Sequence, residues 1–320
     1  MTSMFSSTFW TIFNAIFQLS LISMAAGVLV RKQMVSQEQV QAVSTLTVNV
    51  FLPCLIVATT MTRFDPGQFP FWWAWPLSGV GLFAAGTLFT GLLTRMKTAK
   101  RHLIPMASIQ NGIYFVLPIG QILYPDQFDL FALYCFLLIT GMTPLTWSVG
   151  KVLLTGKSAV DIQWQDFITP PLVATLVALL LIFSGLSAMV PAPVISAMNF
   201  LGQATVPLAV FILGATIGTI SLRRMPPLGD ILTVAVVKFM LIPATVMGIL
   251  YFTGVYGTMP LFSSMMILQS SSPPATNLIL MVKHYGGDTQ AISSMMLVQY
   301  LLALPAMPLW LALWHGFLAV

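Results

Sequence analysis

This chain of 320 residues has very little charge: Asp, Glu, Lys and Arg make up 7% of it, against roughly 25% in an ordinary soluble domain. Hydrophobic residues make up 58%. A soluble domain of this length needs many more charged side chains to cover its surface. The composition therefore excludes a cytosolic enzyme and a disordered protein, and it indicates a chain that lives in a lipid bilayer.

Residues that support chemistry are equally scarce. The two cysteines, Cys54 and Cys135, lie in apolar stretches, which excludes a disulfide framework and favours small buried hydrophobes. The three histidines lack metal-ligand spacing, and no nucleophile with a base and no HExxH motif lies in an apolar stretch. We therefore expect no metal, no cofactor and no enzyme activity. The 13 basic residues are spread along the chain, which favours loop topology over nucleic-acid binding.

The apolar residues form ten segments, each long enough to cross about 30 Å of hydrocarbon as a helix. The segments are apolar all round, whereas strands of a membrane barrel alternate in polarity. The first segment is too long for a signal peptide and is interpreted as a retained span. Divided at clusters of charge, proline and glycine, the segments are Thr8–Val30, Val40–Met61, Phe71–Thr94, His102–Leu123, Phe128–Leu154, Phe167–Val190, Ile195–Ile220, Ile231–Phe252, Met259–Val282 and Ala291–Phe317.

Lysine and arginine are concentrated in alternate loops. Short loops that carry Lys and Arg stay in the cytoplasm. Only Arg63 lies in an even-numbered loop, and Lys238 lies inside the eighth segment. With an even number of spans, both termini are therefore expected outside. The odd-numbered loops hold eleven of the thirteen basic residues: Arg31, Lys32, Arg95, Lys97, Lys100, Arg101, Lys151, Lys157, Arg223, Arg224 and Lys283.

Proline spacing predicts an internal repeat of residues 1–155 in residues 156–320. The matched pairs are Pro53 with Pro207, 154 positions apart, and Pro105 with Pro260 and Pro118 with Pro273, each 155 apart. Tyr124 and Tyr285 are 161 apart, as if about six residues were added around the ninth segment. Because five spans are an odd number, the second repeat crosses the membrane in the opposite sense. Inverted repeats of this kind are typical of secondary transporters, whose sites lie where broken helices meet.

The fourth and ninth segments are predicted to be broken helices. The fourth places Asn111, Gly112 and Pro118 within two turns, and a proline inside a helix removes a hydrogen bond and clashes one turn back. Polar backbone freed at this depth must face protein or a water-filled cavity. The ninth segment is too polar for a helix that faces lipid, because it contains Ser270, Ser271, Ser272, Pro273, Pro274 and Asn277.

Together these breaks predict a site for an anion. Pro118 and Pro273 are each expected to begin a half-helix whose N–H groups point at the break, and helix N-termini attract anions. The neutral donors expected around the carboxylate are Asn111, Ser271, Ser272 and Asn277, with Gly112 in the break. The alternative is a pair of ordinary proline kinks whose backbone groups are satisfied by neighbouring Ser, Thr or water.

Lys238 has two open interpretations. An intramembrane cation is a functional candidate and could balance an anionic substrate, but its long side chain could instead reach the cytoplasmic interface. No Asp or Glu lies in the interior of a segment, because all eight lie in loops or at segment ends. This absence argues against coupling to protons or sodium through a buried carboxylate, and it favours a uniporter or exchanger driven by gradient and membrane potential.

Several stretches carry a family resemblance. Asn111 to Pro118, followed by Tyr124, resembles the asparagine-to-proline motif of the auxin efflux carrier family. That family includes plant auxin exporters and bacterial proteins often called malonate or dicarboxylate transporters, and this chain resembles a bacterial member. The resemblance covers almost the whole chain, because four further stretches are similar: NVFLPCL, TPPLVATLVALLL, LGQATVPLAVFILGATIG and PPATNLILMVKHYGGD.

The resemblance implies an elevator-type carrier of ten helices in two inverted repeats. Segments 1, 2, 6 and 7 would form a scaffold, and segments 3–5 and 8–10 a mobile transport domain that contains the crossed fourth and ninth helices. The substrate carboxylate would lie against Asn111 and the half-helix ends begun by Pro118 and Pro273. The chain departs from the family pattern at Val116 and Thr169, so the identity of the substrate is not carried over.

We therefore expect a secondary transporter of a small organic anion in the inner membrane of a bacterium. Two alternatives stay open, which are a sodium-coupled symporter of the bile-acid type and a sensor built on the same fold. The expected partners are the anion and membrane lipid, and a homodimer through the scaffold is a further option.

Overall fold

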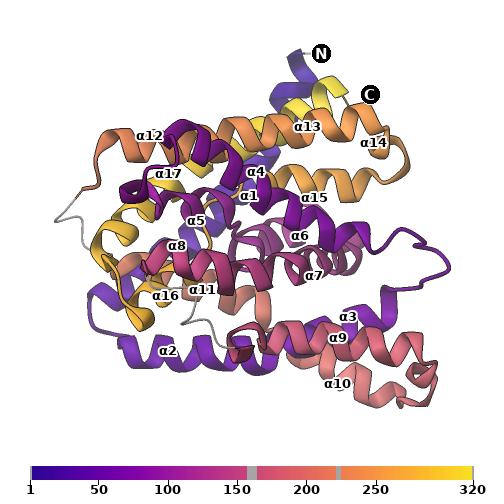
Figure 1. Ribbon diagram of the computed structural model, residues 1–320. Helices are drawn as coiled ribbons and strands as arrows, with labels where there is room; N and C mark the ends of the chain where they lie inside the picture. The colour runs from indigo at the N-terminus through magenta and orange to yellow at the C-terminus, as the bar shows by residue number, and fades with distance from the viewer. Residues whose placement is uncertain (1, 157–163, 221–224, 319–320) are drawn as a thin grey trace.

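The computed structural model describes residues 2–156, 164–220 and 225–318, and these are almost entirely helical (Figure 1). Lys157, Arg223 and Arg224, used above for orientation, lie outside the described residues. Among the described residues, seven helical segments are long enough to cross a membrane, and two apolar helices, Gly112–Leu123 and Pro170–Phe183, are shorter than these. The prediction of an all-helical membrane protein is confirmed. The segments long and apolar enough to cross a membrane are Phe5–Arg31, Gln37–Arg63, Ala74–Thr94, Pro125–Thr155, Ala192–Gly218, Leu228–Thr253 and Thr289–Gly316.

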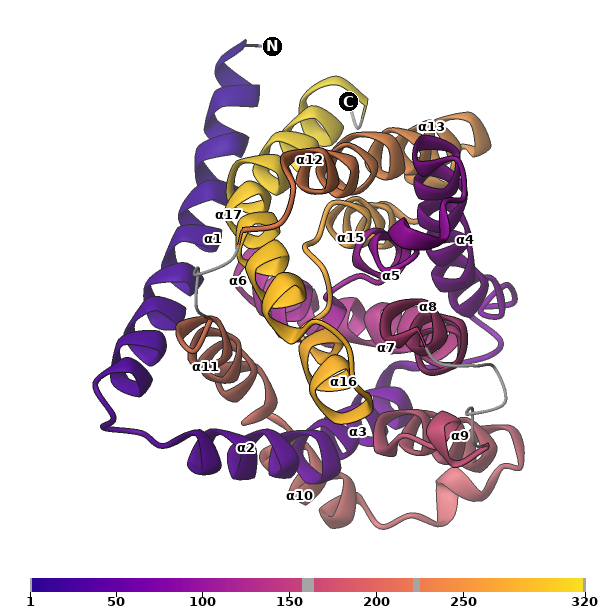
Figure 2. The ribbon, with the colours of Figure 1, turned by 60° about the vertical axis from the view of Figure 1, so that its left-hand side comes forward.

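Six helices form an L-shaped layer along one side of the molecule (Figure 2). Within it, α1 packs against α11, and α3 packs against both α9 and α10. The layer consists of α1 (Thr2–Arg31), α2 (Gln37–Leu46), α3 (Leu52–Arg63), α9 (Pro170–Phe183), α10 (Ala192–Gly202) and α11 (Thr205–Gly218).

The other helices form a central bundle inside the angle of the L (Figure 2). The bundle meets the layer where α17 packs against α1 and where α7 packs against α3. Its members are α4 (Ala74–Thr94), α5 (Leu103–Ser108), α6 (Leu117–Leu123), α7 (Phe128–Leu145), α8 (Lys151–Thr155), α12 (Leu228–Val236), α13 (Ile242–Thr253), α14 (Val255–Thr258), α15 (Pro260–Ser270), α16 (Asn277–Tyr285) and α17 (Thr289–Leu313).

Glycine lets helices approach closely in both parts. A Cβ at Gly214 of α11 would lie 2.1 Å from the Ser23 carbonyl oxygen of α1. One at Gly141 of α7 would lie 1.9 Å from the Pro76 carbonyl oxygen of α4. The hydrophobic effect does not drive helices together within lipid, so membrane helices associate through close packing, which small residues permit. The layer and the bundle are therefore each held by tight contacts of their own.

Three spans continue through a proline by widening into a π-helical turn. The turns η1 (Thr47–Phe51), η3 (Gly112–Val116) and η9 (Val237–Leu241) each end two residues before a proline. A wider turn relieves the clash of the proline ring with the preceding turn. Proline also has no N–H to donate, and at Pro243 the free Phe239 carbonyl accepts from Trp310 Nε1 at 2.7 Å. Proline in these spans therefore widens the helix without ending it.

The structure shows a break in both the fourth and the ninth predicted segments, but the prolines do not begin the second half-helices. The helix after the first break begins at Gly112, six residues before Pro118. The helix after the second break begins at Asn277, and Pro273 lies inside the break. The expected roles of these two prolines are wrong, because the π turn η3 absorbs Pro118 and the pair Pro273–Pro274 keeps the chain non-helical.

The proline register of the repeat also fails at this pair. The last residues of α5 and α15, Ser108 and Ser270, are 162 positions apart, not 155. The extra length precedes the break, because α15 has 11 residues and α5 has 6. Pro118 and Pro273 are therefore not equivalent positions.

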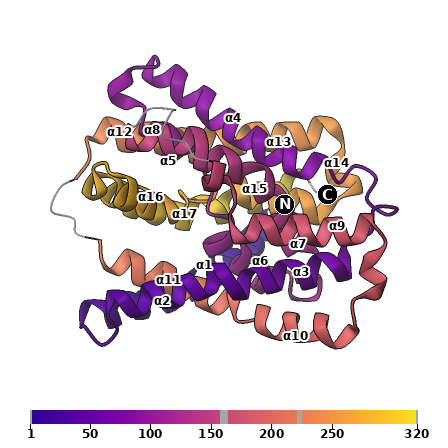
Figure 3. The same ribbon diagram turned by 60° about the horizontal axis from the view of Figure 1, so that its bottom comes forward.

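The predicted odd-numbered loops meet at one end of the molecule. Arg31 Nε donates to the Gly218 carbonyl at 2.9 Å, and Arg101 donates to the Gly156 carbonyl at 3.2 Å. Lys100 forms an ion pair with Asp230 at 2.6 Å. The first and last helical segments also lie together, and the N- and C-termini are close in all three views (Figures 1, 2 and 3).

Candidate functional site

The two broken segments cross in the bundle and pair through their backbones. Gln110 and Pro274 form an isolated antiparallel bridge. The Asn111 N–H donates to the Pro273 carbonyl at 3.1 Å, and the Ala275 N–H donates to the Ile109 carbonyl at 3.3 Å. Prolines accept but cannot donate backbone hydrogen bonds. Pro273 therefore supplies its carbonyl to the other break, and the Pro274 carbonyl accepts from the Tyr300 hydroxyl of α17 at 3.0 Å.

The side chain of Asn111 organises this crossing. It is 2% exposed, and its Oδ1 accepts from the Tyr114 N–H at 3.2 Å, which caps η3. Its Nδ2 donates to Thr276 Oγ1 at 3.0 Å and to the Tyr300 hydroxyl. A primary amide has two N–H donors, so both donors of Asn111 are used within the protein. Asn111 therefore lies at the crossing of the two breaks, and its side chain joins the breaks to each other.

Asn277 differs from Asn111 because one of its side-chain polar atoms makes no hydrogen bond within the protein. It is the first residue of α16, and its Oδ1 is buried without a hydrogen-bond partner. It lines both of the cavities described below. Since buried polar atoms are normally paired, an unpaired one beside a cavity indicates a place for a ligand or water.

The serines of the second break face the protein. Ser271 donates to the Ile267 carbonyl of its own helix at 2.8 Å. Ser272 donates to the Gln269 carbonyl at 2.9 Å and lies 3.4 Å from Gln110 Oε1. Its hydroxyl oxygen also accepts from the Asn111 N–H at 3.2 Å. Both side chains stabilise the break, and neither lines a cavity described here.

Gly112 is required by close packing at the crossing. A Cβ at this position would lie 2.7 Å from Ile139 Cδ1 and 2.8 Å from Gln269 Nε2. Together with Asn111 and Asn277, Gly112 lines a small cavity of about 90 Å³. Some first-turn N–H groups are paired, since Asn111 caps the Tyr114 N–H, and the Leu278 and Ile279 N–H groups donate to the carbonyls of Ala275 and Thr276 at 3.1 and 3.2 Å. The helix starts at Gly112 and Asn277 each present a partial positive charge at this crossing.

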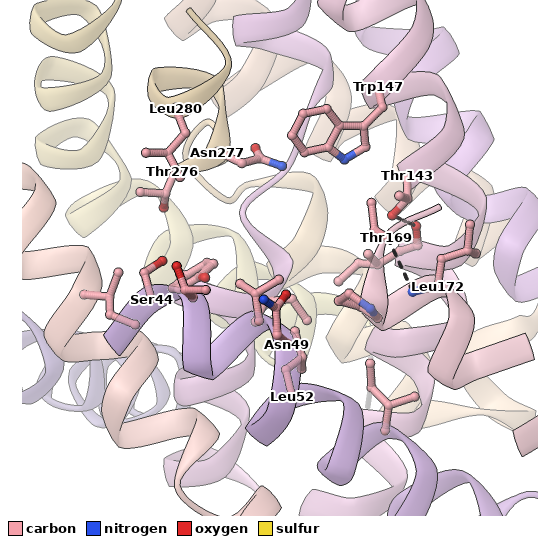
Figure 4. Close-up of a pocket in the computed structure, with 18 of the residues that line it drawn as sticks. Ser44, Asn49, Leu52, Thr143, Trp147, Thr169, Leu172, Thr276, Asn277 and Leu280 are labelled. Carbon is pink, nitrogen blue, oxygen red and sulfur yellow. Dashed lines mark hydrogen bonds between the residues drawn. The ribbon is translucent and has the colours of Figure 1, made fainter. Parts of the chain in front are cut away.

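A larger cavity of about 400 Å³ lies between the layer and the bundle, next to the crossing (Figure 4). It shares Tyr114, Thr143, Trp147, Thr276 and Asn277 with the small one. Figure 4 shows side chains of both parts around it, with Asn277 and Trp147 on the bundle side. No Asp, Glu, Lys, Arg or His is among the residues that line either cavity. The layer contributes Ser44, Asn49, Thr169, Thr175 and Thr216.

A third cavity, of about 500 Å³, lies at the other end of the same interface. Along α11, Val206 and Pro207 at the start of the helix line this third cavity, whereas Ile212 and Thr216 farther on line the 400 Å³ cavity. Pro118 lines the third cavity. The structure thus separates Pro118 from the crossing cavity to which the sequence assigned it.

Lys238 lines none of these three cavities and does not reach an interface. Its side chain is 0% exposed and lies in η9 of the bundle. Its Nζ donates to the carbonyls of Ala107 and Ile109 at 3.1 and 3.3 Å, and to Gln110 Oε1 at 2.5 Å. The snorkelling interpretation is wrong, because these oxygens, freed where α5 ends, satisfy the ammonium group inside the bundle.

Several residues of the site were not predicted from the sequence. Tyr300 and Trp147 lie in apolar stretches of α17 and η5, where an aromatic residue predicts only packing. Asn49 and Thr276 lie within the stretches NVFLPCL and PPATN that resemble a known family, which could have indicated them. Within the described ranges, no group of three or more His, Cys, Asp or Glu residues could hold a metal ion.

The second half of the chain is similar to a known family. Residues 154–311 match the family model described as membrane transport protein. This range runs from the end of α8 to the end of α17 and includes the second break with Asn277. No curated protein matches the chain.

Proposed function

We propose that the chain is a secondary transporter of the membrane transport protein family, that of the auxin efflux carriers, and that it moves a small organic anion. The match over residues 154–311 supports this assignment. A member of this family is a transporter and not an enzyme. The anion binds where the 400 Å³ cavity reaches the crossing, and the bundle carries it across the membrane as an elevator.

The arrangement of helices supports ten spans in two inverted repeats, residues 1–155 and 156–320. On this proposal the L-shaped layer is the scaffold, and the central bundle is the transport domain. Tight glycine contacts within each part support movement as two bodies. The cavity between them supports a substrate path along their shared face. A homodimer would form through the scaffold.

The single observation that carries the proposal is a neutral cavity that ends at two helix N-termini. Backbone N–H groups at a helix start bind anions without a fixed charge. A cavity of about 400 Å³ is in the range that holds a small organic molecule. Tyr114, Trp147 and Leu280 supply apolar surface beside the polar crossing. We infer a substrate with one carboxylate and an apolar body, since the lining offers no Lys, Arg or His for a second carboxylate.

The site residues have distinct roles on this proposal. The Asn277 Nδ2 and the backbone N–H groups of Gly112 and Asn277 donate to the carboxylate. Asn111 holds the two breaks in register, and Ser272 and Pro273 hold the Asn111 backbone. Ser271 stabilises the end of α15.

Charge in the loops sets the proposed orientation. Thr216, near the end of α11, lines the 400 Å³ cavity, and Gly218 at that end accepts from Arg31. Basic loops stay in the cytoplasm, so we place this cavity on the cytoplasmic side of a bacterial inner membrane and both termini outside. The described conformation then faces inward, and the third cavity belongs to the outer side.

Uptake by proteoliposomes tests the function. Labelled malonate, other dicarboxylates and indole-3-acetate are offered with and without a sodium gradient, a pH gradient and an imposed potential. We expect saturable flux of a monocarboxylate that responds to potential alone. Flux that requires sodium would support a symporter of the bile-acid type instead. Specific binding without flux would support a sensor.

A cross-link between the two parts tests the elevator movement. In a background without Cys54 and Cys135, Thr143→Cys on the bundle and Thr169→Cys on the layer are joined by a flexible thiol-reactive linker. Uptake should fall to background and return when the linker is cleaved. The matched control joins Val57→Cys and Val177→Cys, which both line an open groove of the layer. Equal loss in the control, or full uptake in the cross-linked test pair, would contradict the movement.

A further inference from the structure

The surroundings of Lys238 form an oxygen cage at the end of a broken helix. Its Nζ contacts two main-chain carbonyls and one amide oxygen, all from the segment Ala107–Gln110. α5 ends at Ser108, so these groups lie at the C-terminal, partially negative end of that helix. The cage lies directly before Asn111 in the chain and therefore directly beside the crossing.

The contacts show which form of the amine fits this cage. Three acceptors surround Nζ, and an ammonium group has three N–H donors, whereas a neutral amine has two. None of the three ion pairs among the described residues involves Lys238. The charge of Lys238 is therefore balanced only by oxygen dipoles, and its field extends to the neighbouring crossing.

Oxygen cages of this composition are places for free cations in other carriers. Unwound carbonyls and the C-terminal ends of half-helices coordinate the coupling ion in transporters with discontinuous helices. Here the chain's own ammonium group occupies the cage. The Gln110 side chain directs its Oε1 at the lysine, while its Nε2 is buried and has no hydrogen-bond partner.

We propose that Lys238 is a tethered cation. Its ammonium group occupies the oxygen cage beside the crossing, which a free monovalent cation would otherwise need to occupy. The inference rests on the proposed function and adds how the anion is balanced without a co-transported ion. Lys238 acts through the α5 carbonyls and through its field, and it touches no substrate, so it is a positioning residue. The consequence is that transport carries the charge of the anion and needs no small cation.

Cation replacement tests the proposal directly. Uptake by the wild-type protein and by Lys238→Ala is measured at a fixed potential in choline, sodium, potassium and methylammonium buffers. The wild type should transport equally in all four. Lys238→Ala should lose most of its flux in choline, which is too large for the cage, and regain it in at least one of the small cations. Lys97→Ala, which removes an exposed lysine from a nearby loop, is the matched control and should behave as the wild type.

A second variant keeps the lysine and changes only its charge balance. Gln110→Glu preserves the shape of the side chain and places a carboxylate where Oε1 now contacts Nζ. If the field of Lys238 helps to hold the anion, its Kd should rise roughly tenfold, with flux still independent of the cation. If Lys238 is only structural, a stronger partner leaves the Kd unchanged. This variant decides the question even when Lys238→Ala does not fold.

The outcomes separate this proposal from the proposed function. A wild-type protein that neither binds nor moves any offered anion contradicts the function itself. A wild-type protein that transports, combined with a Lys238→Ala flux that no cation restores and an unchanged Kd in Gln110→Glu, overturns the tethered cation alone. A wild-type flux that needs sodium also overturns it.

Discussion

Removal of the Asn277 side chain should separate binding from stability. Its Oδ1 has no partner in the folded protein, so Asn277→Ala breaks no hydrogen bond of that atom. We expect the free energy of unfolding to change by less than about 0.5 kcal/mol. The donor to a carboxylate is the Nδ2 of Asn277, since an amide oxygen and a carboxylate both only accept. A hydrogen bond to a charged group contributes about 1.5–3 kcal/mol, so loss of this one bond should raise the Kd by roughly 10- to 100-fold.

The assay measures both quantities on the same purified protein. The Kd of the best transported anion is measured by calorimetry in detergent, and stability is measured by thermal unfolding without the anion. Asn199→Ala is the matched control, because Asn199 is exposed and lines the third cavity at the other end of the interface. The control should bind as the wild type does.

Two results would refute the reasoning on Asn277. An unchanged Kd in a folded Asn277→Ala would remove this side chain from the binding site. A loss of thermal stability as large as the loss of binding energy would show that Asn277 supports the fold instead of the ligand. Either result would return the carboxylate to the donors of Asn111, which are free only if the contacts with Thr276 and Tyr300 break.

Three further pairs of variants test the packing, each by thermal unfolding. Asn111→Ala should cost about 1–2 kcal/mol, because it removes the cap of η3, and it should also weaken binding; Asn111→Asp keeps the cap acceptor and should recover part of the stability. Lys151→Met should cost about 3 kcal/mol, since it breaks a largely buried ion pair with Asp166, whereas Arg63→Met breaks an exposed pair and should cost less than about 1 kcal/mol. Gly141→Ala places a Cβ 1.9 Å from a carbonyl oxygen of α4 and should destabilise by about 1–3 kcal/mol, whereas Gly81→Ala meets nothing within 4 Å and should be neutral or slightly stabilising.

Composition and local chemistry were enough to predict the class of fold. A charge content of 7% excludes a soluble surface, and runs of about 20 apolar residues leave a helix as the economical way to satisfy the backbone in lipid. The polar residues and prolines of the fourth and ninth segments predicted breaks, because such residues are stable at that depth only against protein or a cavity. These inferences depend only on how each residue type interacts with lipid and on which residues are adjacent in the sequence.

The tertiary structure decided what each residue does at the crossing. Pro118 and Pro273 look equivalent in sequence, but one follows a π turn and lines a separate cavity, and the other accepts the Asn111 N–H across the break. The amino-acid sequence does not reveal whether the two N–H donors of the Asn111 amide already have partners within the protein. That depends on Thr276 and Tyr300, which follow Asn111 by 165 and 189 positions.

The sequence by itself determined that this protein is a helical membrane protein with two interrupted segments, because transfer of apolar and polar groups into lipid depends on residue type alone. Only the tertiary structure decided that Lys238 binds oxygens at the C-terminal end of α5 and that Asn277 keeps an unpaired oxygen beside the cavity. Hydrogen bonds require partners within about 3 Å, and it is the packing of the bundle that brings such partners together.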